Sequence, residues 1–132
     1  MNTPRLIVTL ALGGLLTAQA QADSAVAVST AGQQAQRDGE TLYHTICQAC
    51  HMDQGQGAKG AAAYPALANN PRLAAAAYPI YMVANGQSGM PAFKSSLSDE
   101  EIAAVVGYIR SHFGNQYTEP VTLQDVRNVT RR

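Results

Sequence analysis

The chain has 132 residues, 46% hydrophobic and 14% charged, and its nine basic residues balance its nine acidic ones. This length suits one domain with a modest core. The neutral balance argues against a nucleic-acid-binding protein and against one that docks on anionic lipid, because both need a basic surface.

The N-terminus has the three parts of a secretory signal peptide. Met1 to Arg5 is short and basic, Leu6 to Leu16 is apolar, and residues 17–22 (TAQAQA) offer A-x-A cleavage sites. The apolar run is too short to span a membrane, which takes about 20 residues. We predict a signal peptide over residues 1–22 and a periplasmic mature chain.

Small and apolar residues recur at helical spacing between Gln33 and Cys47, which predicts the first helix of the mature chain. Gly39 lies inside this helix, where glycine costs about 1 kcal/mol relative to alanine. The segment alone leaves open whether Gly39 marks a close helix crossing or a weak point.

Both cysteines of the chain fall in the next five residues, Cys47-Gln48-Ala49-Cys50-His51. In C-x-x-C-H the two thiols attach a haem covalently and the histidine is its proximal iron ligand. Residues three apart lie on one side of a helical turn, so both sulfurs can reach one porphyrin edge. The motif predicts one haem c, held through Cys47 and Cys50, with His51 on the iron.

Two other readings of the motif are weaker. A thioredoxin-like redox pair needs a βαβ context, and no strand–helix alternation is visible. A structural zinc site needs four ligands. Only His44 and His112 remain to complete one, and neither stands in a finger-like pattern. We expect both histidines to have surface, core or helix-end roles.

The middle of the chain is predicted to be loops and short helices. Residues 55–63 contain three glycines and read as loop, and no stretch alternates as a strand. Pro71 and Pro79 each stand where a short helix can begin.

The second axial ligand must come from elsewhere in the chain. Met1 leaves with the signal peptide, and Met52 follows His51 too closely to reach the opposite haem face. Met82 sits in a predicted short helix, where methionine more often fills a core. Met90 lies in the glycine-rich loop 85–93, just before Pro91, and is the preferred ligand.

A second long helix begins at a capping box. Ser98 can accept from a free backbone N–H while Glu101 reaches back, and Gly114 is a C-terminal stop. The apolar stripe of this helix comprises Ile102, Val105, Val106, Ile109 and Phe113. Thr122 to Asp125 is a similar start, so a short helix is expected in the tail.

Four elements in order give the chain its resemblance to the class I c-type cytochromes. They are the pair Gly39 and Tyr43 before the C-x-x-C-H motif, the segment 64–67 (YPAL), the segment 90–93 (MPAF) and the helix segment 106–110 (VGYIR). Together they cover most of the mature chain.

The resemblance implies an all-α fold whose first and last helices cross near Gly39, with loops wrapped around one haem. It implies that the Pro65 carbonyl accepts the N–H of His51, that Leu67 packs on the haem and that Met90 is the second ligand. The family's usual tryptophan is absent. Other possible donors to a haem propionate are Arg72, Tyr81 and Lys94, though each also suits ordinary surface or packing.

We therefore predict a signal peptide over residues 1–22, a cytochrome domain over 23–116 and a C-terminal extension over 117–132. The expected function is that of a periplasmic one-electron carrier between a dehydrogenase or quinol-oxidising complex and an oxidase or reductase, not an enzyme. The extension resembles those of cytochrome subunits of periplasmic dehydrogenases. The alternative is a haem protein with an open sixth site, which binds ligands or acts as a peroxidase.

Overall fold

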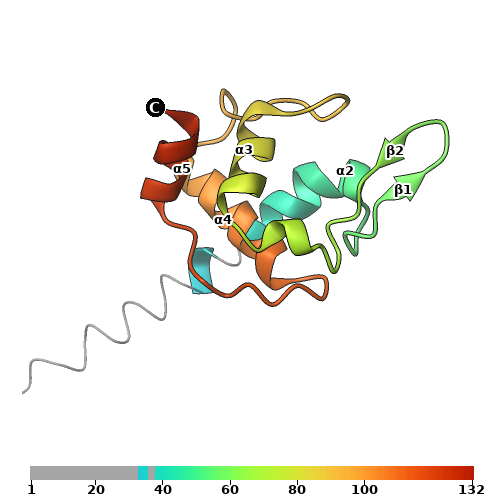
Figure 1. Cartoon of the computed structure of the whole chain (residues 1–132), viewed down its shortest axis with the longest axis horizontal. Helices are drawn as coiled ribbons and strands as arrows, with labels where there is room; N and C mark the ends of the chain where they lie inside the picture. The colour runs from blue at the N-terminus through green and yellow to red at the C-terminus, as the bar shows by residue number, and fades with distance from the viewer. Residues whose placement is uncertain (1–32, 36–37) are drawn as a thin grey trace, which may run out of the picture.

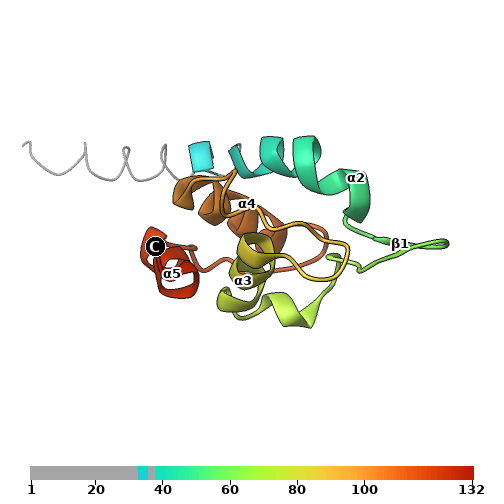
Figure 2. The ribbon, with the colours of Figure 1, turned by 90° about the horizontal axis from the view of Figure 1, so that it is seen from above.

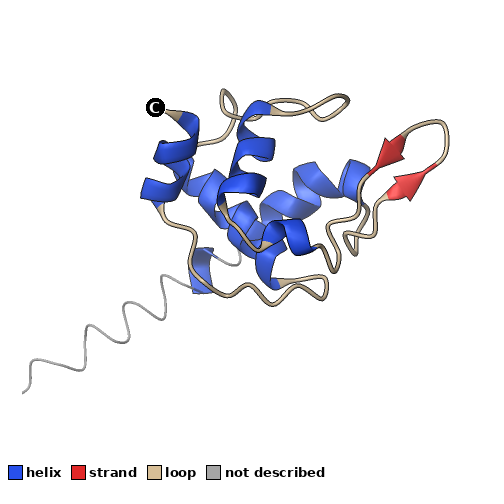
Figure 3. Cartoon of the chain, viewed as in Figure 1, coloured by secondary structure: helices blue, strands red, loops and turns tan. Residues whose placement is uncertain are grey.

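The computed structural model describes residues 33–35 and 38–132, so the predicted signal peptide lies outside the described residues. Helices dominate, as the sequence predicted, and the two strands are short (Figure 3). None of the helices in the described part is long and apolar enough to cross a membrane.

The helix that carries the C-x-x-C-H motif changes its winding before it ends. Residues 38–42 are α-helical. The chain then makes a π-helical turn, η1 (Tyr43–Cys47), and continues as α2 (Gln48–His51). The turn is closed by the Gln48 N–H donating to the Tyr43 carbonyl five residues back. Single π turns inside α-helices are frequent at functional sites.

The region predicted as loop after α2 contains a small hairpin. Strands β1 (Ala58–Lys59) and β2 (Ala63–Tyr64) pair antiparallel, with Ala58 opposite Tyr64. The hairpin projects from the end of the molecule opposite the C-terminus (Figure 1). The expectation of no strand was wrong here, because two-residue strands are too short to show an alternating pattern.

Two short helices follow at the predicted prolines. η2 (Pro71–Leu73) is a 3-10 turn in which the Arg72 N–H donates to the Asn70 side chain. α3 (Ala77–Asn85) carries Pro79 in its first turn. Proline is tolerated there because its missing N–H would have had no partner within the helix.

The long helix α4 (Asp99–Ser111) starts at the predicted capping box of Ser98 and Glu101. Gly39 of the first helix lies against it. A Cβ on Gly39 would stand 2.3 Å from the Ala104 carbonyl oxygen and 2.9 Å from the Tyr108 Cβ. Figure 2 shows the first helix lying against α4, and Figure 1 shows the two helices running in different directions. Gly39 is therefore the crossing point that the resemblance implied.

The last helix, α5 (Leu123–Thr130), begins at the predicted capping box of Thr122 and Asp125. It packs on both α3 and α4 (Figures 1 and 2). Val126 at its centre is fully buried in the core cluster. The tail thus contributes to the same hydrophobic core as the residues that precede it.

A buried arginine ties this tail to the rest of the fold. The Arg110 side chain is 3% exposed and donates to the backbone carbonyls of Leu73, Ala74 and Glu119 at 2.8–3.0 Å. The Glu119 carboxylate lies 3.4 Å away but is 78% exposed. The carbonyl contacts, rather than the exposed ion pair, satisfy the buried guanidinium.

Replacing Arg110 by methionine should lower the free energy of unfolding of the protein by about 3 kcal/mol, because the partner carbonyls lose their donors inside the protein. Urea unfolding followed by circular dichroism measures the change. Glu119→Ala is the matched control and should cost at most about 1 kcal/mol, as exposed ion pairs do. Equal losses from both variants would contradict the assignment of the stabilising role to the carbonyls.

Candidate functional site

The attachment motif occupies the end of the first helix. Cys47 closes η1, and Cys50 and His51 belong to α2. Both cysteines are half-buried, whereas His51 is buried. Cys47 and His51 line a cavity between this helix, α3 and α4. The motif thus presents a thiol and an imidazole to the same enclosed space.

One nitrogen of His51 is held by the backbone. Its Nδ1 lies 2.9 Å from the Pro65 carbonyl oxygen. A carbonyl only accepts hydrogen bonds, so Nδ1 carries the proton and Nε2 is left with its lone pair. This arrangement orients the ring and raises its basicity as a metal ligand. The resemblance had implied this contact.

The cavity wall is almost wholly apolar. Leu67, which the resemblance placed on the haem, is among the residues that line it. The others, apart from Cys47 and His51, are Pro65, Asn70, Arg72, Leu73, Tyr78, Pro79, Met82, Val83, Met90, Val105 and Ile109. Arg72 carries the one permanent charge among these described lining residues. Such a wall suits a large flat apolar cofactor with a polar edge.

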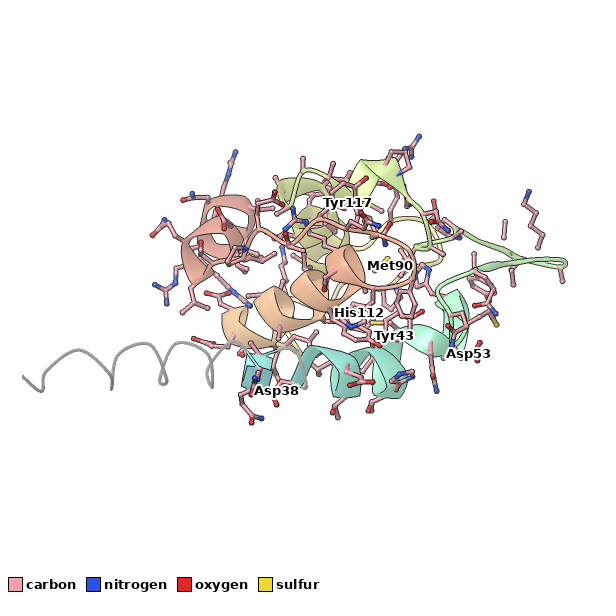
Figure 4. The ribbon with its side chains drawn as sticks, turned by 90° about the horizontal axis from the view of Figure 1, so that it is seen from below. Asp38, Tyr43, Asp53, Met90, His112 and Tyr117 are labelled. Carbon is pink, nitrogen blue, oxygen red and sulfur yellow. The ribbon has the colours of Figure 1, made fainter. Side chains whose placement is uncertain are left out.

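Met90 reaches this cavity from a tight loop. The backbone groups of Gln87 and Met90 bond to each other in both directions, at 3.0 and 2.9 Å. Gly86 has φ +68°, and a Cβ there would lie 2.4 Å from the Met90 carbonyl oxygen. Glycine is therefore needed at the entry to the loop. Figure 4 marks the position of Met90.

The competing ligands fall into two groups. Met82 lines the cavity, as Met90 does. His44 is exposed, with Nδ1 2.7 Å from the Gln48 side chain. His112 stacks on Tyr108 with 4.1 Å between ring centroids, and its Nδ1 lies 2.9 Å from the Tyr108 carbonyl at the end of α4. The geometry thus leaves Met90 and Met82 as the methionine candidates and puts both histidines outside the cavity wall.

The three suggested propionate donors separate in the structure. Arg72 lines the cavity, whereas Tyr81 and Lys94 do not. Tyr81 is 55% exposed, and the Lys94 ammonium donates to the Asn85 side chain at 3.2 Å. Arg72 is the one of the three whose position suits a polar edge of the cofactor.

One buried side chain that shapes the site escaped the sequence reasoning. Asn115 accepts from the Asn70 N–H at 2.9 Å and donates to the carbonyls of Leu67 and Ile109 at 2.9 and 2.8 Å. It thereby fixes the loop that carries Leu67 against α4. An asparagine after a helix stop has no distinctive pattern, so only tertiary contacts reveal this role.

The rival chemistries of the motif find little support in the geometry. Burial raises the pKa of the Cys47 thiol to about 11, whereas thiol–disulfide exchange needs a thiolate. No group of three or more His, Cys, Asp or Glu side chains that could hold a metal ion occurs within the described ranges. The Cys47 thiol on the cavity wall, with Cys50 one helical turn further along, the oriented imidazole and the apolar wall fit a covalently held haem.

Comparison with known proteins points the same way. Residues 34–109 match the family model described as cytochrome c oxidase, cbb3-type, subunit III. A cytochrome c6 of Diacronema lutheri is 34% identical over 58% of this chain and 95% of its own length.

Two further relatives are larger proteins. The fructose dehydrogenase cytochrome subunit of Gluconobacter japonicus is 34% identical over 59% of this chain and 19% of its own. The quinone-dependent alcohol dehydrogenase cytochrome c subunit of Gluconobacter oxydans is 30% identical over 69% and 21%. The chain spans about one fifth of the length of these subunits. With the match to the family model, these relatives show that the chain belongs to this family of c-type cytochromes and that its cofactor is haem c.

Proposed function

We propose that this cytochrome is a periplasmic one-electron carrier in which Cys47 and Cys50 hold the haem and His51 and Met90 are the axial ligands. The observation that carries the proposal is that His51 and Met90 line the same cavity. When bound, the haem supplies the Fe(II)/Fe(III) couple. The chain's part is to hold it, fill its axial positions and keep water away.

The ligand set accounts for the expected chemistry. Because the Pro65 carbonyl accepts the proton on Nδ1 of His51, the lone pair of the ring is on Nε2. The Met90 thioether is a soft neutral donor, which favours ferrous iron and raises the reduction potential relative to a second histidine. The apolar wall disfavours the more highly charged oxidised state, so it also raises the reduction potential. Two protein ligands leave no position for oxygen, which suits electron transfer.

The proposed partners are a periplasmic dehydrogenase or quinol-oxidising complex as donor and an oxidase or reductase as acceptor. The names of the dehydrogenase cytochrome subunits among the relatives support the donor. Tyr78 on the cavity wall and the neighbouring Tyr81 are 38% and 55% exposed, which suits a small apolar docking surface. Transient redox encounters bury less than about 1,200 Å² in total. The periplasmic location rests on the predicted signal peptide over residues 1–22.

An optical spectrum of the exported protein tests the proposal. The reduced protein should show a c-type spectrum that carbon monoxide leaves unchanged, because both axial positions are filled by the chain. A mass spectrum should show one haem added and both thiols consumed. A clear shift on adding carbon monoxide would instead support the alternative of an exchangeable sixth site.

A further inference from the structure

The segment that follows Met90 is tied to α3 on one side. The Phe93 N–H donates to the Val83 carbonyl at 3.0 Å, and the Lys94 N–H donates to the Ala84 carbonyl at 3.1 Å. These two bonds fix the exit of the methionine loop relative to a wall of the cavity.

The same segment is tied to the tail on its other side. Arg132 donates through its two terminal nitrogens to the carbonyls of Lys94 and Leu97, the latter at 3.0 Å. Its Nε donates to the Asp99 carboxylate at 2.6 Å, and Arg127 reaches the other oxygen of that carboxylate at 3.4 Å. One guanidinium thus joins the methionine segment to the first residue of α4.

The guanidinium is held in place by the helix that precedes it. α5 is fixed by the burial of Val126 and by its packing on α3 and α4. The hydrogen bond from Arg132 lowers the pKa of Asp99, so this carboxylate stays ionised to a lower pH than an ordinary aspartate does. The connection from α5 to the loop is therefore present at neutral pH.

We infer that Arg132, carried by α5, is a positioning residue for Met90, and that the tail sets how readily the methionine leaves the iron. The inference rests on the proposed role of Met90 as axial ligand. The tail then influences the axial ligand through the Met90 segment, although Arg132 does not line the cavity. Loosening the carbonyls of Lys94 and Leu97 would let the loop open while the C-x-x-C-H attachment stays intact.

Imidazole binding to the ferric holoprotein tests the inference, because imidazole competes with Met90 for the iron. Arg132→Ala should bind imidazole about tenfold more tightly than the wild type, because the state in which Met90 has left the iron is more populated in the variant. The far-red absorption band of methionine-ligated ferric haem should weaken, and the reduction potential should fall. High salt should raise imidazole affinity in the wild type but not in Arg132→Ala, since it screens the Asp99 contact.

Two control variants separate positioning from general stability. Arg131→Ala removes the same charge from the neighbouring exposed side chain, and it should bind imidazole as the wild type does. Ile102→Val shortens a fully buried side chain of α4 and lowers global stability without touching Arg132. It should lower the melting temperature and leave the far-red band unchanged.

The outcomes distinguish this inference from the proposed function. A wild type that lacks the far-red band and binds carbon monoxide would overturn Met90 as ligand, and the inference with it. A closed wild type with an equally closed Arg132→Ala variant would overturn the inference alone. Equal loosening in Ile102→Val or Arg131→Ala would also overturn it. If Arg132→Ala fails to fold, Asp99→Asn and the salt dependence of the wild type provide the same comparison.

Discussion

Replacing Met90 by alanine should leave the haem covalently attached and lower the reduction potential by roughly 100 mV or more, within the range of about 0.8 V that axial ligands span. The attachment survives because Cys47, Cys50 and His51 belong to a different element. The potential falls because a soft thioether is lost and a water or hydroxide takes its place. Spectroelectrochemistry measures the potential, and carbon monoxide binding to the reduced variant should appear.

Met82→Ala is the matched control for this variant, because Met82 lines the same cavity from α3. It removes a thioether of equal size and should change the potential far less than Met90→Ala does, with no carbon monoxide binding. The reverse pattern, with the large change in Met82→Ala, would identify Met82 as the ligand. An unchanged potential in Met90→Ala would contradict the assignment outright.

The second large effect is expected at the helix crossing. Gly39→Ala should lower the free energy of unfolding by about 3 kcal/mol, although glycine-to-alanine changes inside helices normally stabilise by about 1 kcal/mol. The added Cβ would meet the Ala104 carbonyl carbon and oxygen at 2.8 and 2.3 Å. These are backbone atoms of α4, which cannot move aside without separating the two helices.

Gly107→Ala on α4 provides the contrast. A Cβ at Gly107 would meet nothing within 4 Å, so this change should stabilise the protein by up to about 1 kcal/mol through helix propensity. Urea unfolding of both holoproteins measures the pair. If Gly39→Ala were as stable as Gly107→Ala, the close crossing would not exist in solution.

Sequence patterns predicted the parts of this protein that depend on local chemistry. The capping boxes at Ser98 and Thr122 are local hydrogen-bond patterns, and both helices start where these residues predict. The C-x-x-C-H motif likewise depends only on helical spacing, and the match to the cytochrome family bears out the haem. The roles of Pro65, Leu67 and Met90 as haem contacts stay predictions.

Tertiary contacts account for what the sequence did not show. Arg110 looks like an ordinary charged residue near a helix end, and only the fold brings three carbonyls to its guanidinium. Arg132 and Asp99 stand 33 positions apart, so no local pattern links them. The extension over residues 117–132 is predicted because it lies beyond the long helix that ends near Gly114. Its apolar residues nevertheless complete the core.

The π turn between Tyr43 and Cys47 changes the number of residues between the Gly39 crossing and the attachment motif. A π turn inside an α-helix holds one additional residue, because its hydrogen bonds join residues five apart instead of four. The Gly39 crossing and the attachment motif therefore stay in place when that residue is gained or lost. A related chain with one residue fewer here can build the same junction with a plain α-helix, so a one-residue gap in an alignment at this point would mark a change of winding rather than a change of site.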